Sequence, residues 1–121
     1  MKRLIAAFAL AAGAMPRPAL ADGDAAHGQQ IYESRCVACH SPDANRVGPM
    51  HRGVFGRKAG SVANYNYSNA LKDADVVWGD DTLDKWLTNP QAFIPGQKMN
   101  FKVANPQDRA DVIAYLKTLK P

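Results

Sequence analysis

The sequence predicts a small all-α domain in which three to five short helices are connected by two long loops. Three segments combine helix-capping residues with apolar side chains at helical spacing: 22–35, 80–89 and the segment after Asn105. The stretch 41–67 contains many Gly and Pro residues and shows little periodicity, and 91–104 is a second loop. The sequence shows no alternation of strand and helix patterns, so it does not predict a βαβ unit.

The first half of the domain is expected to hold one longer and one shorter helix. The segment 22–35 begins with Asp22 or Asp24 as a cap, and its apolar face contains Gly28, Ile31 and Tyr32. A short helix is predicted over 68–74, with Ser68 as its cap.

The second half is expected to hold two helices. Asp80 and Asp81 suit the positive N-terminus of the helix 80–89, which Pro90 ends. Asn105 caps the last helix, with Pro106 at its first position and Asp108 three residues after the cap. The predicted apolar positions of the two helices are Leu83, Trp86 and Leu87, then Ala110, Ile113, Tyr115 and Leu116.

Loops of this length are unusual in a small domain. They become reasonable when they pack on a large apolar group at the centre of the fold. The pattern therefore favours a domain built around a cofactor.

The N-terminus is typical of a cleaved secretory signal. Lys2 and Arg3 precede the apolar run 4–14, and Ala19-Leu20-Ala21 forms a small-x-small cleavage site. The run is too short to span a bilayer, so we expect no stable membrane insertion, with an uncleaved anchor as the alternative. The sequence thus predicts a signal peptide over 1–21, a mature domain over 22–121 and a periplasmic location.

Removal of the signal changes the charge of the chain. The full sequence has 15 Lys and Arg against 11 Asp and Glu, and three of the basic residues lie within 1–21. The mature domain therefore has a net charge of +1. No basic cluster is interleaved with aromatic residues, so we expect no nucleic-acid partner.

The motif with the most specific chemistry is Cys36-Val37-Ala38-Cys39-His40. C-x-x-C-H is the signature for attachment of a c-type haem. Two thiols at this spacing add to the two vinyl groups of the porphyrin, and the adjacent His40 then ligates the iron. A zinc site would need more ligands than these two cysteines offer, and a dithiol redox site would usually accompany a βαβ pattern. The sequence therefore predicts one covalent haem c.

The second axial ligand distinguishes a carrier from a haem enzyme, because an open iron position permits catalysis. The candidates in the mature domain are His27, Met50, His51 and Met99. Met50 and His51 follow His40 too closely to reach the opposite face of the haem. Met99 lies after the rigid turn Pro95-Gly96, which favours it as the ligand.

The mature chain resembles the class I cytochromes c, the soluble monohaem proteins of mitochondria and proteobacteria. The resemblance rests on these segments: Cys36–His40, Gly48-Pro49, 53–60, Trp78-Gly79, Asn89-Pro90, 94–96, Lys98-Met99 and 109–116. It implies the cytochrome c fold and a crossing of the first and last helices. It also implies that the Pro49 carbonyl accepts a hydrogen bond from His40, and that Arg57, Tyr67 and Trp78 hold the haem propionates. Family members usually carry leucine where this chain has His51.

From the ligands and the resemblance we expect a single-electron carrier and not an enzyme. A haem enzyme such as a peroxidase and a haem-free dithiol protein are the rival classes. The expected partners are redox proteins: a bc-type complex, an oxidase, a photosynthetic reaction centre or a periplasmic dehydrogenase. We expect the carrier to be a monomer.

Overall fold

The computed structural model describes residues 9–14 and 22–121. The predicted signal peptide lies outside the described residues, apart from 9–14, which form neither helix nor strand. Over 22–121 the structure contains α-helices and no strand; its only β contact is an isolated bridge between Lys58 and Val77. The helices are α1 (Ala25–Arg35), α2 (Asn69–Asp73), α3 (Asp80–Thr88), α4 (Pro90–Phe93) and α5 (Pro106–Thr118).

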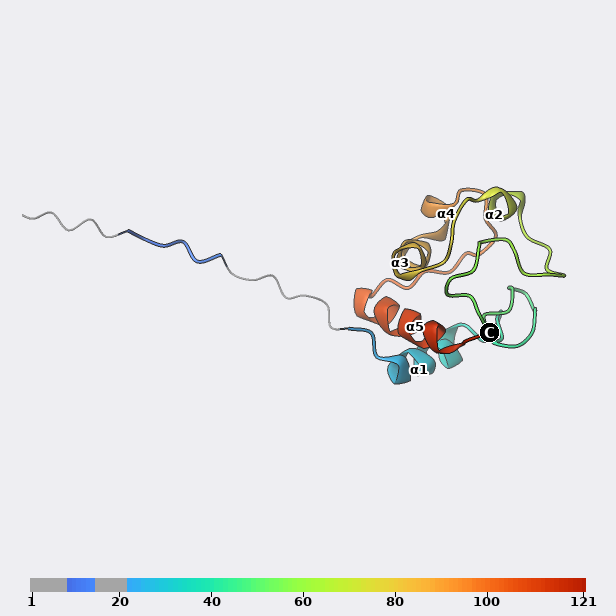
Figure 1. Cartoon of the computed structure of the whole chain (residues 1–121), viewed down its shortest axis with the longest axis horizontal. Helices are drawn as coiled ribbons and strands as arrows, with labels where there is room; N and C mark the ends of the chain where they lie inside the picture. The colour runs from blue at the N-terminus through green and yellow to red at the C-terminus, as the bar shows by residue number, and fades with distance from the viewer. Residues whose placement is uncertain (1–8, 15–21) are drawn as a thin grey trace, which may run out of the picture.

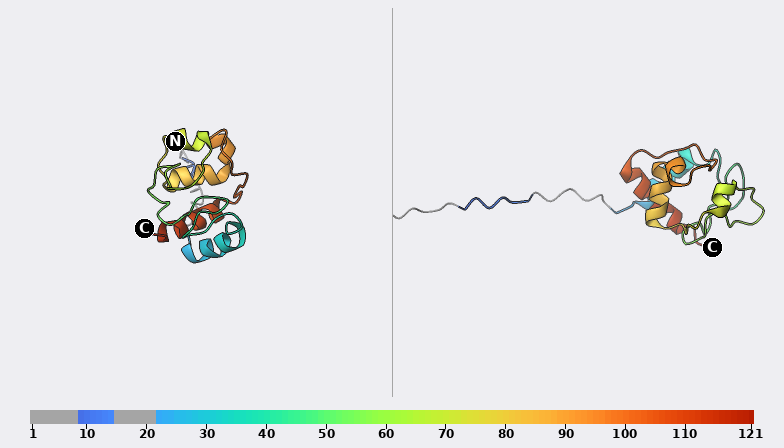
Figure 2. Two further views of the ribbon diagram at one scale, coloured as in Figure 1. Left: turned by 90° about the vertical axis from the view of Figure 1, so that its right-hand side faces the viewer. Right: turned by 90° about the horizontal axis from the view of Figure 1, so that it is seen from above.

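The helices form two groups. Figures 1 and 2 show α1 and α5 packed against each other on one side of the domain, with α2, α3 and α4 on the other. The long loop between α1 and α2 closes a third side (green in Figure 1). No helix in the described part of the chain is long and apolar enough to cross a membrane.

Side-chain caps place the starts of the helices where the sequence predicts them. The carboxylate of Asp24 accepts from the backbone N–H groups of Ala26 and His27, so Asp24 and not Asp22 begins α1. Ser68 caps α2 through the N–H of Leu71 at 3.1 Å. Asn105 caps α5, and its side-chain oxygen accepts from the N–H groups of Gln107 and Asp108 at 2.8 and 3.1 Å.

The helix α4 corrects the prediction of an uninterrupted loop over 91–104. Pro90 ends α3 as expected, but it is also the first residue of α4. Proline suits that position because its fixed φ is helical and its missing N–H would have no partner there. The side chain of Asn89 accepts from the N–H of Ala92 at 3.2 Å and so caps the new turn.

The crossing of α1 and α5 depends on Gly28, which is buried. A Cβ at this position would lie 1.9 Å from the carbonyl oxygen of Asp111 and 3.0 Å from the Cβ of Tyr115. The two backbones therefore touch at a distance that only glycine permits. This contact brings Tyr32 beside Tyr115, with ring centroids 5.1 Å apart.

Replacement of Gly28 by alanine gives a prediction with a clear sign. In an isolated helix this change stabilises by about 1 kcal/mol. Here it must separate α1 from α5, and we expect the free energy of unfolding to fall by about 3 kcal/mol, the upper end of the range for overpacking. Chemical denaturation of the holo-protein measures the change. Gln29→Ala, at the next and exposed position, is the control, and a stabilised Gly28→Ala variant would contradict the contact.

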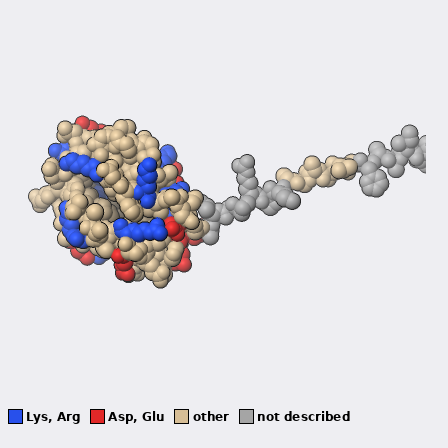
Figure 3. All heavy atoms as spheres, turned by 180° about the vertical axis from the view of Figure 1, so that it is seen from behind, with Lys and Arg blue, Asp and Glu red and all other residues tan. Residues whose placement is uncertain are grey.

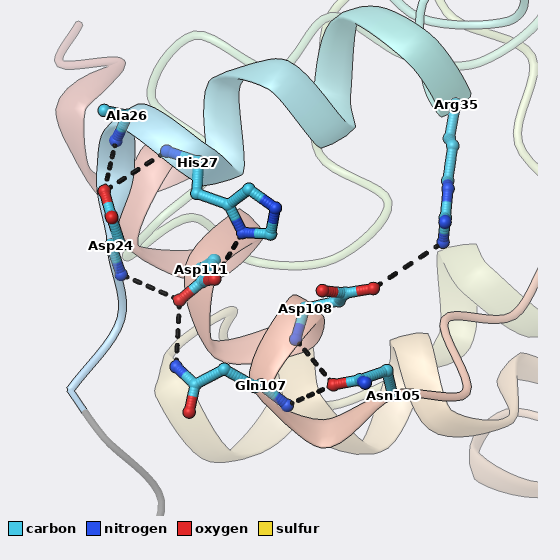
Figure 4. Close-up of polar contacts among 8 residues, drawn as sticks. All are labelled: Asp24, Ala26, His27, Arg35, Asn105, Gln107, Asp108 and Asp111. Carbon is cyan, nitrogen blue, oxygen red and sulfur yellow. Dashed lines mark hydrogen bonds and ion pairs between the residues drawn. The ribbon is translucent and has the colours of Figure 1, made fainter.

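A buried carboxylate also joins α1 to α5 (Figure 4). Asp111 has a side chain that is only 4% exposed, although the sequence pattern placed no polar residue on the inner face of α5. It accepts from the backbone N–H of Asp24 at 2.8 Å, from Nδ1 of His27 at 2.6 Å and from Nε2 of Gln107 at 3.0 Å. Burial alone would raise the pKa of Asp111, but these hydrogen bonds lower it below its ordinary value. The hydrogen bond to Asp111 in turn raises the pKa of His27.

The pair predicts how stability depends on pH. Folding raises the pKa of His27, so the ion pair of His27 with Asp111 stabilises the folded state. This stabilisation is complete below the ordinary histidine pKa, about 6.5, and disappears as the pH rises through the pKa of His27 in the folded protein. The lowered pKa of Asp111 keeps that carboxylate charged until strongly acidic pH. We therefore expect the difference in Tm between wild type and His27→Gln to be largest near about pH 5.5 and to shrink at about pH 8.

Arg35→Gln provides the control for this pH dependence. Arg35 lies 3.9 Å from Asp108, an ion pair that links the same two helices without a histidine. Its effect on Tm should therefore be the same at both pH values. A His27→Gln difference that did not change with pH would show that the imidazole is not charged in the folded protein.

Candidate functional site

The two cysteines lie where α1 ends. Cys36 is the C-cap of α1, and its carbonyl accepts from the backbone N–H groups of Cys39 and His40 at 3.2 and 2.9 Å. This turn brings His40 back beside Cys36. Both thiols are free, Cys39 is exposed and Cys36 is partly buried.

The electrostatics of Cys36 disfavour a dithiol redox site. Burial raises the pKa of the Cys36 thiol to about 11, and the nearby Arg35 offsets only part of this effect. Reactive dithiols depend on a lowered thiol pKa, because the thiolate is the nucleophile. Cys36 therefore lacks the lowered thiol pKa of a reactive dithiol site.

His40 is held with one nitrogen committed and the other available. The structure contains the predicted hydrogen bond: Nδ1 of His40 lies 2.9 Å from the carbonyl oxygen of Pro49. A carbonyl can only accept, so Nδ1 carries the proton and Nε2 presents a lone pair. Burial lowers the pKa of His40, with the Pro49 carbonyl opposing the shift. A neutral imidazole with a fixed tautomer is the form that ligates a metal.

Gly48 allows the chain to approach His40 closely. A Cβ on Gly48 would lie 2.2 Å from Cε1 and 2.6 Å from each ring nitrogen, directly over the face of the imidazole. The N–H of Gly48 donates to the carbonyl of Cys39 at 2.8 Å, which ties this loop to the cysteine turn. The residues around His40 therefore fit a cofactor held on Cys36, Cys39 and Nε2 of His40.

His51 lies against His40, which bears on the question of a second axial ligand. The two imidazole rings are stacked, with centroids 3.9 Å apart and an angle of 19° between their planes. His51 is therefore beside the proximal ligand candidate, and its ring cannot lie on the opposite face of a haem bound to Nε2. Burial, with smaller contributions from the neighbouring His40 and Arg57, holds the pKa of His51 well below its ordinary value.

Met99 is presented by an ordered turn. Gly96 has a positive φ of 92°, and the N–H of Gln97 donates to the carbonyl of Ile94 at 3.2 Å. The buried side chain of Gln97 accepts from the N–H of Met99 at 2.5 Å. Met99 itself is partly buried and packs against the apolar core.

Arg57, Tyr67 and Trp78, which are predicted to hold the propionates, lie close together. Arg57 and Trp78 are linked by the bond from the N–H of Trp78 to the carbonyl of Arg57, at 2.9 Å. Burial lowers the pKa of Arg57, and the neighbouring Tyr67 partly offsets this effect. The guanidinium donates to the carbonyls of Met50 and Arg52 at 2.9 and 3.3 Å.

Two donors in this group remain available to a ligand. The hydroxyl oxygen of Tyr67 accepts from the N–H of Val62 at 3.1 Å, and its proton has no acceptor within the described residues. The indole N–H of Trp78 likewise has no acceptor there. Tyr67 and Trp78 are both 8% exposed. Such donors beside a guanidinium are suited to carboxylates, and the propionates of a haem are carboxylates.

Comparison with known proteins agrees with this geometry. The family model described as Cytochrome c matches residues 25–120. The cytochrome c of Euglena viridis is 48% identical over 101 residues, which cover 81% of this chain and 99% of the relative. The cytochrome c2 of Rhodomicrobium vannielii is 46% identical over 122 residues, covering 98% of this chain and 97% of the relative.

A solved structure extends the likeness to three dimensions. Cytochrome cH from Methylobacterium extorquens superposes with a TM-score of 0.76 at 43% identity, covering 79% of this chain and 99% of that structure. The agreement of motif, fold and relatives leads to one conclusion: the chain belongs to the cytochrome c family, whose members are electron carriers with one covalently bound haem c.

Proposed function

We propose that residues 22–121 act in the periplasm as a monomeric carrier of single electrons, after cleavage of the signal peptide 1–21. In this proposal Cys36 and Cys39 would bind the haem covalently, and His40 and Met99 would ligate its iron. When bound, the haem supplies a one-electron redox couple. The observation that carries the proposal is the His40 imidazole, whose Nδ1 is committed to Pro49 while Nε2 is available beside two free thiols.

The remaining site residues act on the position and charge of the cofactor. Pro49 fixes the orientation of the His40 ring, and Gly48 leaves the space that this ring needs. Arg57, Tyr67 and Trp78 offer a positive charge and two free donors to the propionates. The thioether of Met99 would favour ferrous iron, and with both His40 and Met99 holding the iron little would have to rearrange when one electron moves.

The location rests on the N-terminal pattern. The charged residues, the apolar run and the A-x-A site together form a secretory signal. The alignment with the cytochrome c2 of Rhodomicrobium vannielii covers 98% of the chain and therefore includes most of this segment. Mass spectrometry of the exported protein tests the cleavage, with a mature N-terminus at Asp22 as the expected result.

The partners are redox proteins, and the charge of the surface bears on which ones. Several Lys and Arg side chains surround the mostly uncharged middle of the face shown in Figure 3, and Asp and Glu side chains lie mostly toward its edge. This distribution favours a negatively charged docking surface on the partner. The candidate partners are a bc-type complex, an oxidase, a reaction centre and a periplasmic dehydrogenase. We would distinguish between them by measuring which one reduces or oxidises the protein, and whether added salt slows that reaction.

The visible and magnetic spectra of the exported protein test the proposed ligation. A low-spin spectrum in both redox states is the expected result, because two axial ligands leave the iron six-coordinate. A high-spin ferric spectrum would indicate an open position and a haem enzyme. Absence of a Soret band would mean that the thiols act without haem.

A further inference from the structure

Three aromatic side chains form a continuous contact behind the proposed iron ligand. The ring of His51 stacks on His40 with centroids 3.9 Å apart. The hydroxyl of Tyr32 lies 2.9 Å from Nδ1 of His51, and the two rings meet edge to face with their centroids 5.5 Å apart. Tyr32 is 1% exposed and belongs to α1, where it also contacts Tyr115 of α5. His40 is thus connected through two side chains to the helix crossing.

The His40 ring is enclosed on both faces. A Cβ added to Gly48 would lie over one face of the ring, and the three atoms nearest to it would all belong to His40. The position therefore does not lie between the two stacked imidazoles. It follows that Gly48 and His51 occupy opposite faces, while Pro49 holds the edge at Nδ1. Of these three contacts, only the one made by His51 comes from a side chain.

The direction of the Tyr32–His51 hydrogen bond follows from the available acceptors. Burial raises the pKa of Tyr32, so its hydroxyl remains protonated. That proton has no acceptor within the described residues other than Nδ1 of His51. Tyr32 is therefore the donor, and the neutral His51 ring carries its proton on Nε2.

The hydrogen bond restricts how the His51 ring can lie. An apolar side chain at this position would fill the same space without a polar requirement, whereas a buried hydroxyl needs its acceptor in place. Rotation of His51 about its Cβ–Cγ bond would break the bond to Tyr32. The phenol thereby fixes the plane of the imidazole that stacks on His40.

We propose that Tyr32 and His51 are positioning residues for His40, with Tyr32 fixing the plane of His51 and His51 fixing the plane of the ligand ring. The direction in which the Nε2 lone pair of His40 points is thus coupled to the packing of α1 on α5. The inference rests on the proposed role of His40 as an axial ligand.

Two single variants and their combination test the pair. Tyr32→Phe removes only the hydroxyl, and His51→Leu removes the polar ring but keeps an apolar side chain. Tyr115→Phe is the matched control, because it removes a phenol hydroxyl that lies at the same helix crossing but is not hydrogen-bonded to His51. Long-range proton–nitrogen spectra of the ferrous protein report the His51 tautomer. Electron paramagnetic resonance and the hyperfine-shifted ring protons of His40 in the ferric protein report the orientation of the ligand.

The expected results separate positioning from general stability. Wild type should show His51 protonated on Nε2. Tyr32→Phe should shift the g values and the His40 ring resonances, and Tyr115→Phe should leave both unchanged. Because Tyr32 acts through His51, Tyr32→Phe should produce no additional shift in the His51→Leu background. The reduction potential should follow the same non-additive pattern.

The proposal fails if Tyr32→Phe leaves the His40 signals unchanged, if its effect persists in the His51→Leu background, or if His51 carries its proton on Nδ1. In each of these cases, hyperfine shifts of the His40 resonances in the wild-type protein would still support the proposed function, because they show that His40 ligates the iron. Absence of hyperfine shifts on His40 in wild type would instead overturn both proposals, because His40 would not be a ligand.

Discussion

Replacement of both Cys36 and Cys39 by alanine is expected to leave the domain largely unfolded. The domain 22–121 is small, its longest helix, α5, has 13 residues, and isolated helices of this length are marginal in water. Several apolar side chains are only partly buried around the core: Ala70, Leu71, Ala74, Val76, Phe93 and Met99. A bound haem would supply apolar surface against which such residues and the loops pack, so its loss removes much of the driving force for folding.

Far-ultraviolet circular dichroism and thermal unfolding of the exported variant measure this effect. We expect the double variant to lose at least about half of the helical signal and to show no cooperative transition. Val37→Ala is the matched control, because Val37 lies between the two cysteines and is 38% exposed. Native helix content with a cooperative transition in the double variant would show that the polypeptide folds without its cofactor.

Replacement of Met99 by alanine is expected to have the second large effect, on the iron and not on the fold. The variant should keep its covalent haem, because the thiols and His40 are unchanged. Loss of the thioether should convert the ferric protein toward high spin and lower the reduction potential, since this ligand favours ferrous iron. Axial ligands set haem potentials over a range of about 0.8 V, so we expect a decrease on the order of 0.1 V or more.

Met50→Ala is the control for this experiment. Met50 is also partly buried but lies next to Pro49 on the His40 side of the site. It should retain the low-spin spectrum and change the potential little. If Met99→Ala kept the spectrum and the potential of wild type, the second ligand would have to come from another residue, and the stacking of His51 on His40 makes His51 a poor substitute.

Local sequence signals predicted most of the fold because helix caps act over a few residues. Asp24, Ser68 and Asn105 cap the helices as expected, since a short polar side chain followed by an apolar stripe is sufficient to start a helix. The sequence predicts Pro90 only as the end of one helix, whereas the structure also makes it the first residue of α4. Nothing local in the sequence predicts the burial of Asp111, because its three hydrogen-bond donors come from both α1 and α5.

The candidate site was predictable where its chemistry is local in the sequence. Cys36, Cys39 and His40 form a contiguous motif, and the resemblance to the family supplied the bond to Pro49, which the structure contains. The stack of His51 on His40 was not predictable, because it depends on how a loop folds back over the cysteine turn. An uncommon histidine at position 51 was the only signal, and its spacing from His40 does not reveal which face it covers.

The docking of α1 on α5 also has a consequence for the order of events during biosynthesis. The hydrogen bond from Asp24 to Asp111 joins residues separated by 87 positions. Closing so long a loop costs entropy that only the finished contact repays, and contacts of this kind slow folding. A chain that emerges N-terminus first presents α1 before its packing partner. We therefore expect the emerging chain to remain unfolded until α5 has followed, which keeps both thiols accessible for haem attachment before Tyr32 and its neighbours are buried.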